Sequence, residues 1–144
     1  MIIAYFDSSL LMSILLEEDR KHEAREVWNK YEIKVSSVLL KIETSISLLR
    51  FFNRQNNKFD KIWLANKKVK LMELLNNIFF NDITESFANM IVKNNELASC
   101  KSLDAIHIAT ALNIRNNPNN KNIHVCSFDN KMLMAAKKFG FKVN

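Results

Sequence analysis

Short apolar runs alternate with longer amphipathic segments along this chain, and that alternation restricts the folds it can adopt. The runs at 2–6, 33–37 and 123–127 contain β-branched or aromatic residues and end at polar ones, as buried strands do. The intervening segments space their apolar residues three or four apart, as helices do. We therefore predict an α/β fold with a central, mainly parallel sheet surrounded by helices.

The remaining elements continue this alternation to the end of the chain. Residues 116–122 contain the one Pro among five Asn, a composition that predicts a loop. No repeat or change of composition divides the 144 residues, so we expect a single domain over 1–144. Helices are expected over 8–17, 19–31, 38–56, 59–77, 84–97, 102–115 and 130–139, and further short strands over 79–83 and 141–143.

Composition and charge limit which cellular compartment and which kinds of binding partner we expect for this protein. The formal net charge of +6 weakly favours a polyanionic partner such as nucleic acid, although many lysine-rich proteins are basic without one. No apolar run approaches the roughly 20 residues of a membrane helix, and the first residues lack a signal-peptide pattern. We expect a cytoplasmic protein with no membrane partner. Cys100 and Cys126 form no metal-binding spacing, so both are expected to be buried thiols.

Four carboxylates differ from the other acidic residues because their neighbours are mostly apolar. Asp7 and Asp129 each follow an expected strand and precede an expected helix, so either could be a helix N-cap. Asp104 lies in the first turn of its helix, where the helix dipole favours negative charge. Glu43 lies inside an apolar helix, where partial exposure or pairing with Arg50 or a lysine is the ordinary explanation.

Sheet geometry gives these carboxylates a second interpretation. In an open parallel α/β sheet, ligands bind outside the carboxyl ends of the strands, where Asp7 and Asp129 are expected. Asp104 and Glu43 could face the same crevice from their helices. Carboxylates gathered there would repel one another unless a cation neutralised them, and oxygen ligands suit Mg²⁺ or Mn²⁺. Such a site is suited to phosphodiester hydrolysis.

Four segments carry a family resemblance, in the same order as in the family. The sequence resembles PIN-domain ribonucleases, and within them the VapC toxins of bacterial toxin–antitoxin pairs. The resemblance covers nearly the whole chain and implies a three-layer α/β/α fold. It also implies that Asp7, Glu43, Asp104 and Asp129 form the catalytic, metal-binding site for Mg²⁺ or Mn²⁺. The matching segments are YFDSSLLMSILLEED, SSVLLKIETSISLLR, SLDAIHIATAL and VCSFDNKMLMAAKKFGF.

The same resemblance implies a metal-dependent endoribonuclease acting as the toxin of a toxin–antitoxin pair. Its expected substrate is structured RNA such as tRNA, cut to leave a 5′-phosphate. Its expected partners are a second copy of itself, as a homodimer, and a small antitoxin that blocks the acidic site. The segment from about 53 to 101 matches the family only in its pattern, so partner contacts there are inferred from position.

Three further polar residues lie near the expected acids. His107 follows Asp104 by three residues and could act as a general base, but a partly buried histidine with local hydrogen bonds is the favoured interpretation. The hydroxyls of Ser8 and Ser127 could orient the carboxylates. A plain N-cap role is an equal alternative for Ser8.

Two alternatives differ from a ribonuclease. The first is a PIN-like module that binds RNA or a protein without cutting. The second is another Mg²⁺-dependent phosphoryl hydrolase, such as a phosphatase, or a receiver-type domain. A phosphatase with an Asp nucleophile would place a second Asp two residues after Asp7, where Ser9 stands.

Overall fold

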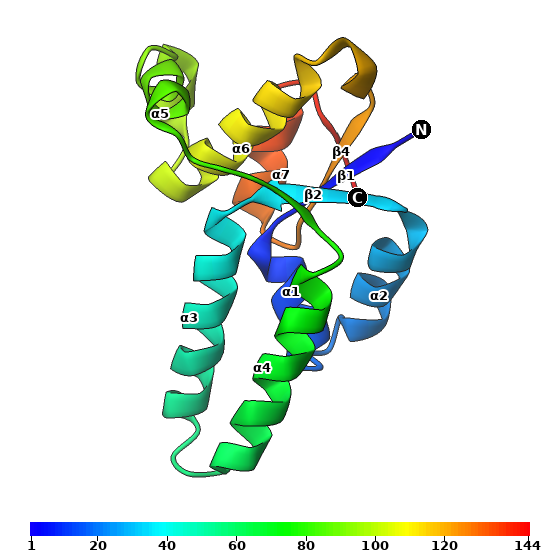
Figure 1. The fold of residues 1–144 in the computed structure, drawn as a ribbon, viewed down its shortest axis with the longest axis vertical. Coiled ribbons are helices and arrows are strands. Elements are labelled where there is room, and N and C mark those ends of the chain that lie inside the picture. The colour runs from blue at the N-terminus through cyan, green and yellow to red at the C-terminus, as the bar shows by residue number, and fades with distance from the viewer.

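The computed structural model describes residues 1–144 and contains one five-stranded sheet (Figure 1). The strand order is β3-β2-β1-β4-β5, and every neighbouring pair is parallel. The predicted α/β class is therefore confirmed, with a sheet that is wholly rather than mainly parallel. The strands are β1 (Ile3–Phe6), β2 (Ile33–Ser37), β3 (Phe79–Asn81), β4 (Ile123–Cys126) and β5 (Lys142–Val143).

Helices fill the connections between the strands. None of them combines the length and the apolarity needed to cross a membrane. The seven α-helices are α1 (Ser8–Leu15), α2 (Lys21–Lys30), α3 (Leu39–Arg54), α4 (Lys61–Leu75), α5 (Glu85–Val92), α6 (Ser102–Arg115) and α7 (Asn130–Lys138), and the two 3₁₀ helices are η1 (Asn95–Ser99) and η2 (Pro118–Asn120).

One expected helix is shorter than its sequence pattern suggested. The helix expected over 84–97 ends at Val92, and η1 begins three residues later. Asn94 separates them because its backbone is extended and its side chain accepts a hydrogen bond from the Glu96 N–H at 3.1 Å. Asn side chains compete with helical hydrogen bonding in this way. The other predicted elements end within three residues of their observed bounds.

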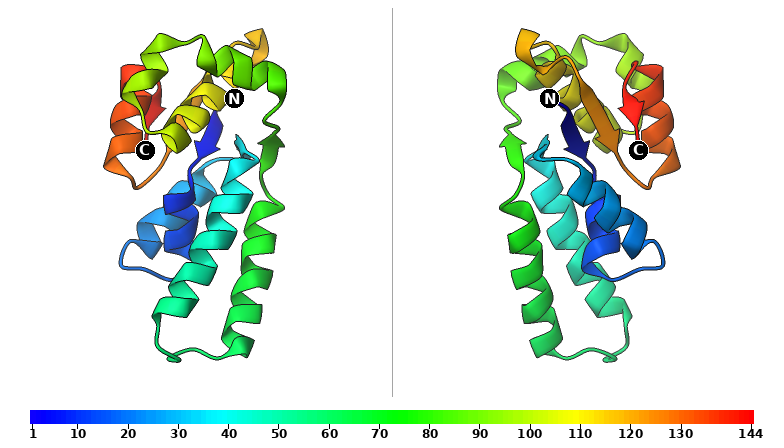
Figure 2. Two further views of the ribbon diagram at one scale, coloured as in Figure 1. Left: turned by 90° about the vertical axis from the view of Figure 1, so that its left-hand side faces the viewer. Right: turned by 90° about the vertical axis from the view of Figure 1, so that its right-hand side faces the viewer.

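Alternate residues of β1 face two different helical layers. Ile3 and Tyr5 pack in a core with α6 and α7, whereas Ala4 and Phe6 pack in a core with α1 and α2. All four are buried, which makes β1 the centre of an α/β/α arrangement (Figure 2). The predicted three-layer fold is confirmed. A long hairpin of α3 and α4 projects beyond the strand ends and packs against α1 (Figure 1).

The strand order also fixes where a ligand site can form. The chain passes from β1 to β2 on one side and returns to β4 on the other side of β1. Connections that leave in opposite directions open a crevice at the carboxyl ends of the two central strands. Asp7 directly follows β1 and Asp129 follows β4 by three residues, so both lie at this crevice.

Candidate metal centre

The four predicted carboxylates come together in one pocket at this crevice. Asp7, Glu43, Asp104 and Asp129 all line a cavity of about 330 Å³. They come from four separate places in the fold: the end of β1, the second turn of α3, the first turn of α6 and the N-cap of α7. The cavity walls also include Ser8, Ser9, Lys101, Ser102, Leu103 and Lys131.

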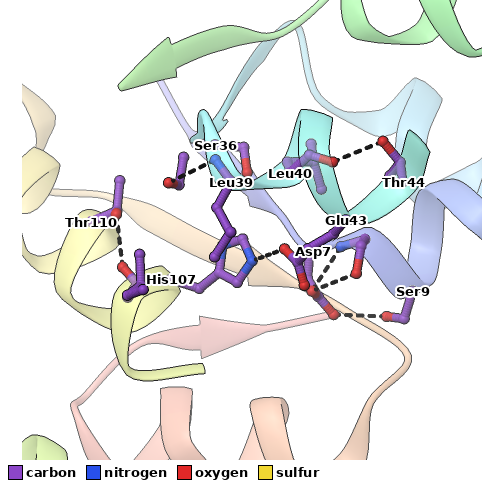
Figure 3. Close-up of polar contacts among 12 residues, drawn as sticks. Asp7, Ser9, Ser36, Leu39, Leu40, Glu43, Thr44, His107 and Thr110 are labelled. Carbon is purple, nitrogen blue, oxygen red and sulfur yellow. Dashed lines mark hydrogen bonds and ion pairs between the residues drawn. The ribbon is translucent and has the colours of Figure 1, made fainter. Parts of the chain in front are cut away.

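Asp7 is the most firmly held of the four carboxylates. It is buried and is the N-cap of α1, where its Oδ1 accepts the Ser8 N–H at 2.7 Å. Its Oδ2 accepts the hydroxyl proton of Ser9 at 2.8 Å (Figure 3). The same oxygen accepts the hydroxyl proton of Ser127 at 2.6 Å. Hydrogen bonds of this kind offset the cost of burying a carboxylate and fix its orientation. Capping and membership of the acidic pocket are thus both true of Asp7.

The two serines that hold Asp7 are themselves fixed by the backbone. Ser9 Oγ accepts the Phe128 N–H at 2.9 Å, and Ser127 Oγ accepts the Asp129 N–H at 2.9 Å. Each hydroxyl therefore accepts from an amide and gives its one proton to Asp7. The predicted orienting hydroxyl of Ser127 has this contact.

Ser8, the other predicted orienting hydroxyl, contacts Asp7 mainly through its backbone. Its Oγ is 3.4 Å from Asp7 Oδ1, too long for a strong hydrogen bond. Ser9, which the sequence reasoning did not select, makes the short side-chain contact instead. The signal was its place two residues after the cap, in the first turn of α1, where its side chain points back toward the strand end.

A buried chain of hydrogen bonds holds Glu43. His107 is 1% exposed, and its Nε2 lies 2.5 Å from Glu43 Oε1 (Figure 3). The other ring nitrogen, Nδ1, lies 2.7 Å from the hydroxyl of Tyr5. That hydroxyl also accepts the Ser37 N–H at 3.1 Å. The partner of Glu43 is therefore a histidine on another helix, and not Arg50 or a lysine.

The contacts of Tyr5 assign the protons along this chain. Burial raises the pKa of the Tyr5 phenol, so it keeps its proton at ordinary pH. The Ser37 N–H can only donate, so His107 Nδ1 is the one acceptor in contact with the Tyr5 hydroxyl, and we assign the phenol proton to that contact. His107 then carries its ring proton on Nε2 and donates it to Glu43.

His107 lies within possible metal-ligand distance of the acids but has no nitrogen to spare. One ligand atom from each of Asp7, Glu43 and His107 lies within 4.8 Å of the others. Both ring nitrogens of His107 are nevertheless engaged, by Tyr5 and by Glu43. The expected partly buried histidine with local hydrogen bonds is only half right, because His107 is hydrogen-bonded but fully buried. Its partners, however, lie 102 and 64 residues away in sequence rather than nearby.

Asp129 and Asp104 are less restrained. Asp129 is exposed and is the N-cap of α7, where its Oδ1 accepts the Lys131 N–H at 2.8 Å. Asp104 has no hydrogen-bond partner among the protein groups. The pKa of Asp104 is raised, first by partial burial and then by the negative charges of Asp129 and Asp7. Lys101 offsets this repulsion only in part, and a bound cation would relieve the remainder.

The donor set fits a hard divalent cation. Mg²⁺ and Mn²⁺ prefer oxygen ligands, and the pocket offers four carboxylates. Asp7 and Glu43 are held in place by hydrogen bonds, while Asp104 and Asp129 keep free oxygens that can turn toward an ion. The pocket therefore combines two fixed and two adjustable carboxylates. Asp104 and Asp129 line it but do not belong to the group of ligand atoms that lie within 4.8 Å of one another.

Comparison with known families agrees with this geometry. The family model described as the PIN domain matches residues 4–138. The chain belongs to the PIN domain family. PIN domains are typically metal-dependent nucleases that act on RNA, so the acidic pocket lies in a nuclease-type module. No curated protein matches the chain closely enough to count as a relative.

Proposed function

We propose that this PIN domain is a Mg²⁺- or Mn²⁺-dependent endoribonuclease. One observation carries the proposal: four carboxylates from four parts of the fold line a single pocket at the carboxyl ends of β1 and β4. Asp7, Glu43, Asp104 and Asp129 are the proposed ligands and catalytic residues. A divalent cation held there supplies Lewis-acid chemistry, lowering the pKa of water and neutralising charge that develops on a phosphate.

The residues of the chain contribute orientation and charge. Asp7 is fixed by Ser9 and Ser127, and Glu43 is fixed by His107, so their oxygens face the pocket in defined positions. Preorganised ligands of this kind need no rearrangement when the substrate binds. Asp104 and Asp129 add negative charge to the pocket. This charge attracts a divalent cation, which the pocket needs before it can accept a phosphate.

The biological role is a second part of the proposal. We propose that the protein is the toxin of a toxin–antitoxin pair, cuts structured RNA such as tRNA, forms a homodimer and is blocked by a small antitoxin. The resemblance to VapC toxins is the basis. Exposed apolar side chains on the projecting hairpin support a protein partner, since such residues are usually covered. They are Ile42, Ile46 and Leu49 on α3 and Ile62, Val69 and Met72 on α4.

A cleavage assay tests the nuclease proposal. Purified protein is incubated with total RNA and tRNA in Mg²⁺ or Mn²⁺, with EDTA as the metal-free arm. Asp104→Asn should slow cutting at least about 100-fold, because several kcal/mol of metal-dependent stabilisation is lost. The matched control is Asp60→Asn, the same change at the N-cap of α4, away from the pocket.

The outcomes separate the candidate functions. Cutting that needs metal, survives Asp60→Asn and fails in Asp104→Asn supports the ribonuclease. RNA binding without cutting in either metal favours the non-cleaving module. Full cutting by a folded Asp104→Asn protein would overturn the assigned site. Growth inhibition on expression, relieved by the product of an adjacent small reading frame, tests the toxin role.

A further inference from the structure

A second groove adjoins the acidic pocket and is lined by lysines. It has a volume of about 550 Å³ and lies between η1, the start of α6 and the length of α7. It shares Lys101, Asp104 and Lys131 with the acidic pocket, so the two spaces lie side by side. Lys138 lines its other part, beside Ser99. We call this space the lysine groove.

Helix stability does not account for two of these lysines. Lys101 occupies the N-cap of α6 without a capping hydrogen bond, and Lys131 is the second residue of α7. The N-terminus of a helix carries partial positive charge, which makes it an unfavourable place for a lysine. Their positions therefore suggest attraction to something negative outside the helix.

One carboxylate, Asp104, lines the lysine groove together with three lysines, and Lys101 offsets part of its charge. Lys101, Lys131 and Lys138 are all exposed, and none of them forms a salt bridge. The one hydrogen bond among their ammonium groups joins Lys138 Nζ to Ser99 Oγ at 2.8 Å. Three exposed cations against one carboxylate leave the groove with a net positive charge, which favours a polyanion as its ligand beside a pocket for phosphodiester chemistry.

The opposite side of the acidic pocket has a different character. A cavity of about 660 Å³ there shares Ser9 with the acidic pocket and is lined by Glu18 and Asp19. Its one cation, Arg20, is paired with Glu23 at 2.7 Å and lies 3.7 Å over the ring of Phe128. This cavity therefore offers a polyanion no free positive charge. The lysine groove and this cavity both adjoin the acidic pocket, but only the lysine groove carries free positive charge.

We propose that the lysine groove holds the RNA backbone on one side of the cleavage point. This inference rests on the proposed ribonuclease function. A phosphate seated among the four carboxylates has neighbours on the same strand. The groove that opens from Asp104 is where those neighbouring phosphates meet Lys101, Lys131 and Lys138. The strand thus enters or leaves between α6 and α7, and not past Glu18 and Asp19.

Salt-dependent binding tests the lysine groove independently of cleavage. A fluorescently labelled single-stranded RNA is titrated in EDTA, so no metal-dependent cutting occurs, over a range of salt concentrations. Each lysine that neutralises one phosphate contributes about 0.7 to the slope of log K against log salt for a single strand. Lys131→Ala and Lys138→Ala should each lower the slope by about 0.7, equivalent to about fivefold weaker binding at 0.1 M salt.

The adjacent Lys137 supplies the matched control. Lys137→Ala removes the same charge from the neighbouring, equally exposed position of α7, but Lys137 does not line the groove. It should leave the slope nearly unchanged. Equal effects of Lys137→Ala and Lys138→Ala would overturn the proposal, because they would show general attraction to net charge. Unchanged RNA binding with lost antitoxin binding would also overturn it and make the groove a protein contact.

The same experiment distinguishes failure of this inference from failure of the proposed function. If wild-type protein cuts RNA in Mg²⁺ but the lysine variants bind RNA normally, the nuclease stands and the groove assignment is wrong. If Lys131→Ala and Lys138→Ala lower the slope but wild-type protein never cuts, the groove stands and the nuclease proposal is wrong.

Discussion

Removing a single oxygen atom from Tyr5 tests whether the buried hydrogen-bond chain positions Glu43. Tyr5→Phe keeps the ring in the core but deletes the hydroxyl that lies 2.7 Å from His107 Nδ1. It also leaves the Ser37 N–H without its acceptor. The Glu43 carboxylate then remains the only hydrogen-bond partner of the His107 ring, and no second contact fixes the orientation of that ring. The variant therefore disturbs a proposed metal ligand without touching it.

The magnitude follows from the groups left unpaired. Tyr5 is fully buried, so His107 Nδ1 and the Ser37 N–H both lose a partner away from water. An unsatisfied buried polar group costs about 1–3 kcal/mol, so unfolding should become roughly 3 kcal/mol easier. At about 4 °C per kcal/mol for a chain of this size, Tm should fall by roughly 12 °C. Disturbing the partner of a metal ligand typically lowers metal affinity or activity about 10-fold or more.

A nearly identical pair elsewhere in the molecule supplies the control. Tyr31 lies 3.0 Å from His124 Nδ1, with ring centroids 5.7 Å apart and planes at 76°. The corresponding values for Tyr5 and His107 are 5.8 Å and 76°. The Tyr31 pair lies at the amino ends of the strands, opposite the acidic pocket. Tyr31→Phe should lower Tm but leave Mn²⁺ affinity and RNA cleavage unchanged.

Three measurements decide the comparison: Tm by circular dichroism, Mn²⁺ affinity by calorimetry and single-turnover cleavage. All are made on both variants at a temperature where both are folded. Tyr5→Phe is expected to weaken Mn²⁺ binding and cleavage in parallel. If Tyr5→Phe and Tyr31→Phe change these two functional readouts equally, Tyr5 and His107 contribute stability alone and the positioning role is refuted.

Three further outcomes are expected. Ser9→Ala should weaken Mn²⁺ binding about 10-fold in calorimetry, because it removes the short hydrogen bond that orients the Asp7 carboxylate. An equal loss in Ser8→Ala, whose hydroxyl is 3.4 Å from Asp7, would contradict this role of Ser9. Asp104→Asn should raise the metal-free Tm at pH 7, because it removes a partly buried charge and its repulsion by Asp129 and Asp7. The pKa of Asp104 is raised, so this gain should fade as pH falls and wild-type Asp104 gains a proton; a gain that does not depend on pH would contradict the explanation. Burial raises the pKa of the Cys126 thiol to about 12, so mass spectrometry of folded protein treated with an alkylating agent at pH 9 should find Cys100 modified and Cys126 unmodified. The same raised pKa means that the stability of the protein should fall as pH rises from 9 toward 12, because the Cys126 thiol loses its proton first in the unfolded chain.

Local patterns were enough to predict much of the fold and the acidic residues of the candidate site. The spacing of apolar side chains is a property of neighbouring residues, so it predicted the alternation of strands and helices and hence the parallel sheet. Asp7 and Asp129 could be placed together because parallel strands bring their carboxyl ends to one edge. The roles of Asp7, Glu43, Asp104 and Asp129, and the single domain over 1–144, stay predictions.

The tertiary structure decided which side chains hold those acids. Tyr5 lies in an apolar run and reads as a core residue, and its hydroxyl acquires a role only when α6 brings His107 against it. Ser9 rather than Ser8 points at Asp7 because of the way α1 starts relative to β4. Lys131 lines the lysine groove only because α7 packs beside α6 in the folded protein. These contacts join residues far apart in sequence, and packing of the layers, not local periodicity, determines which of them meet.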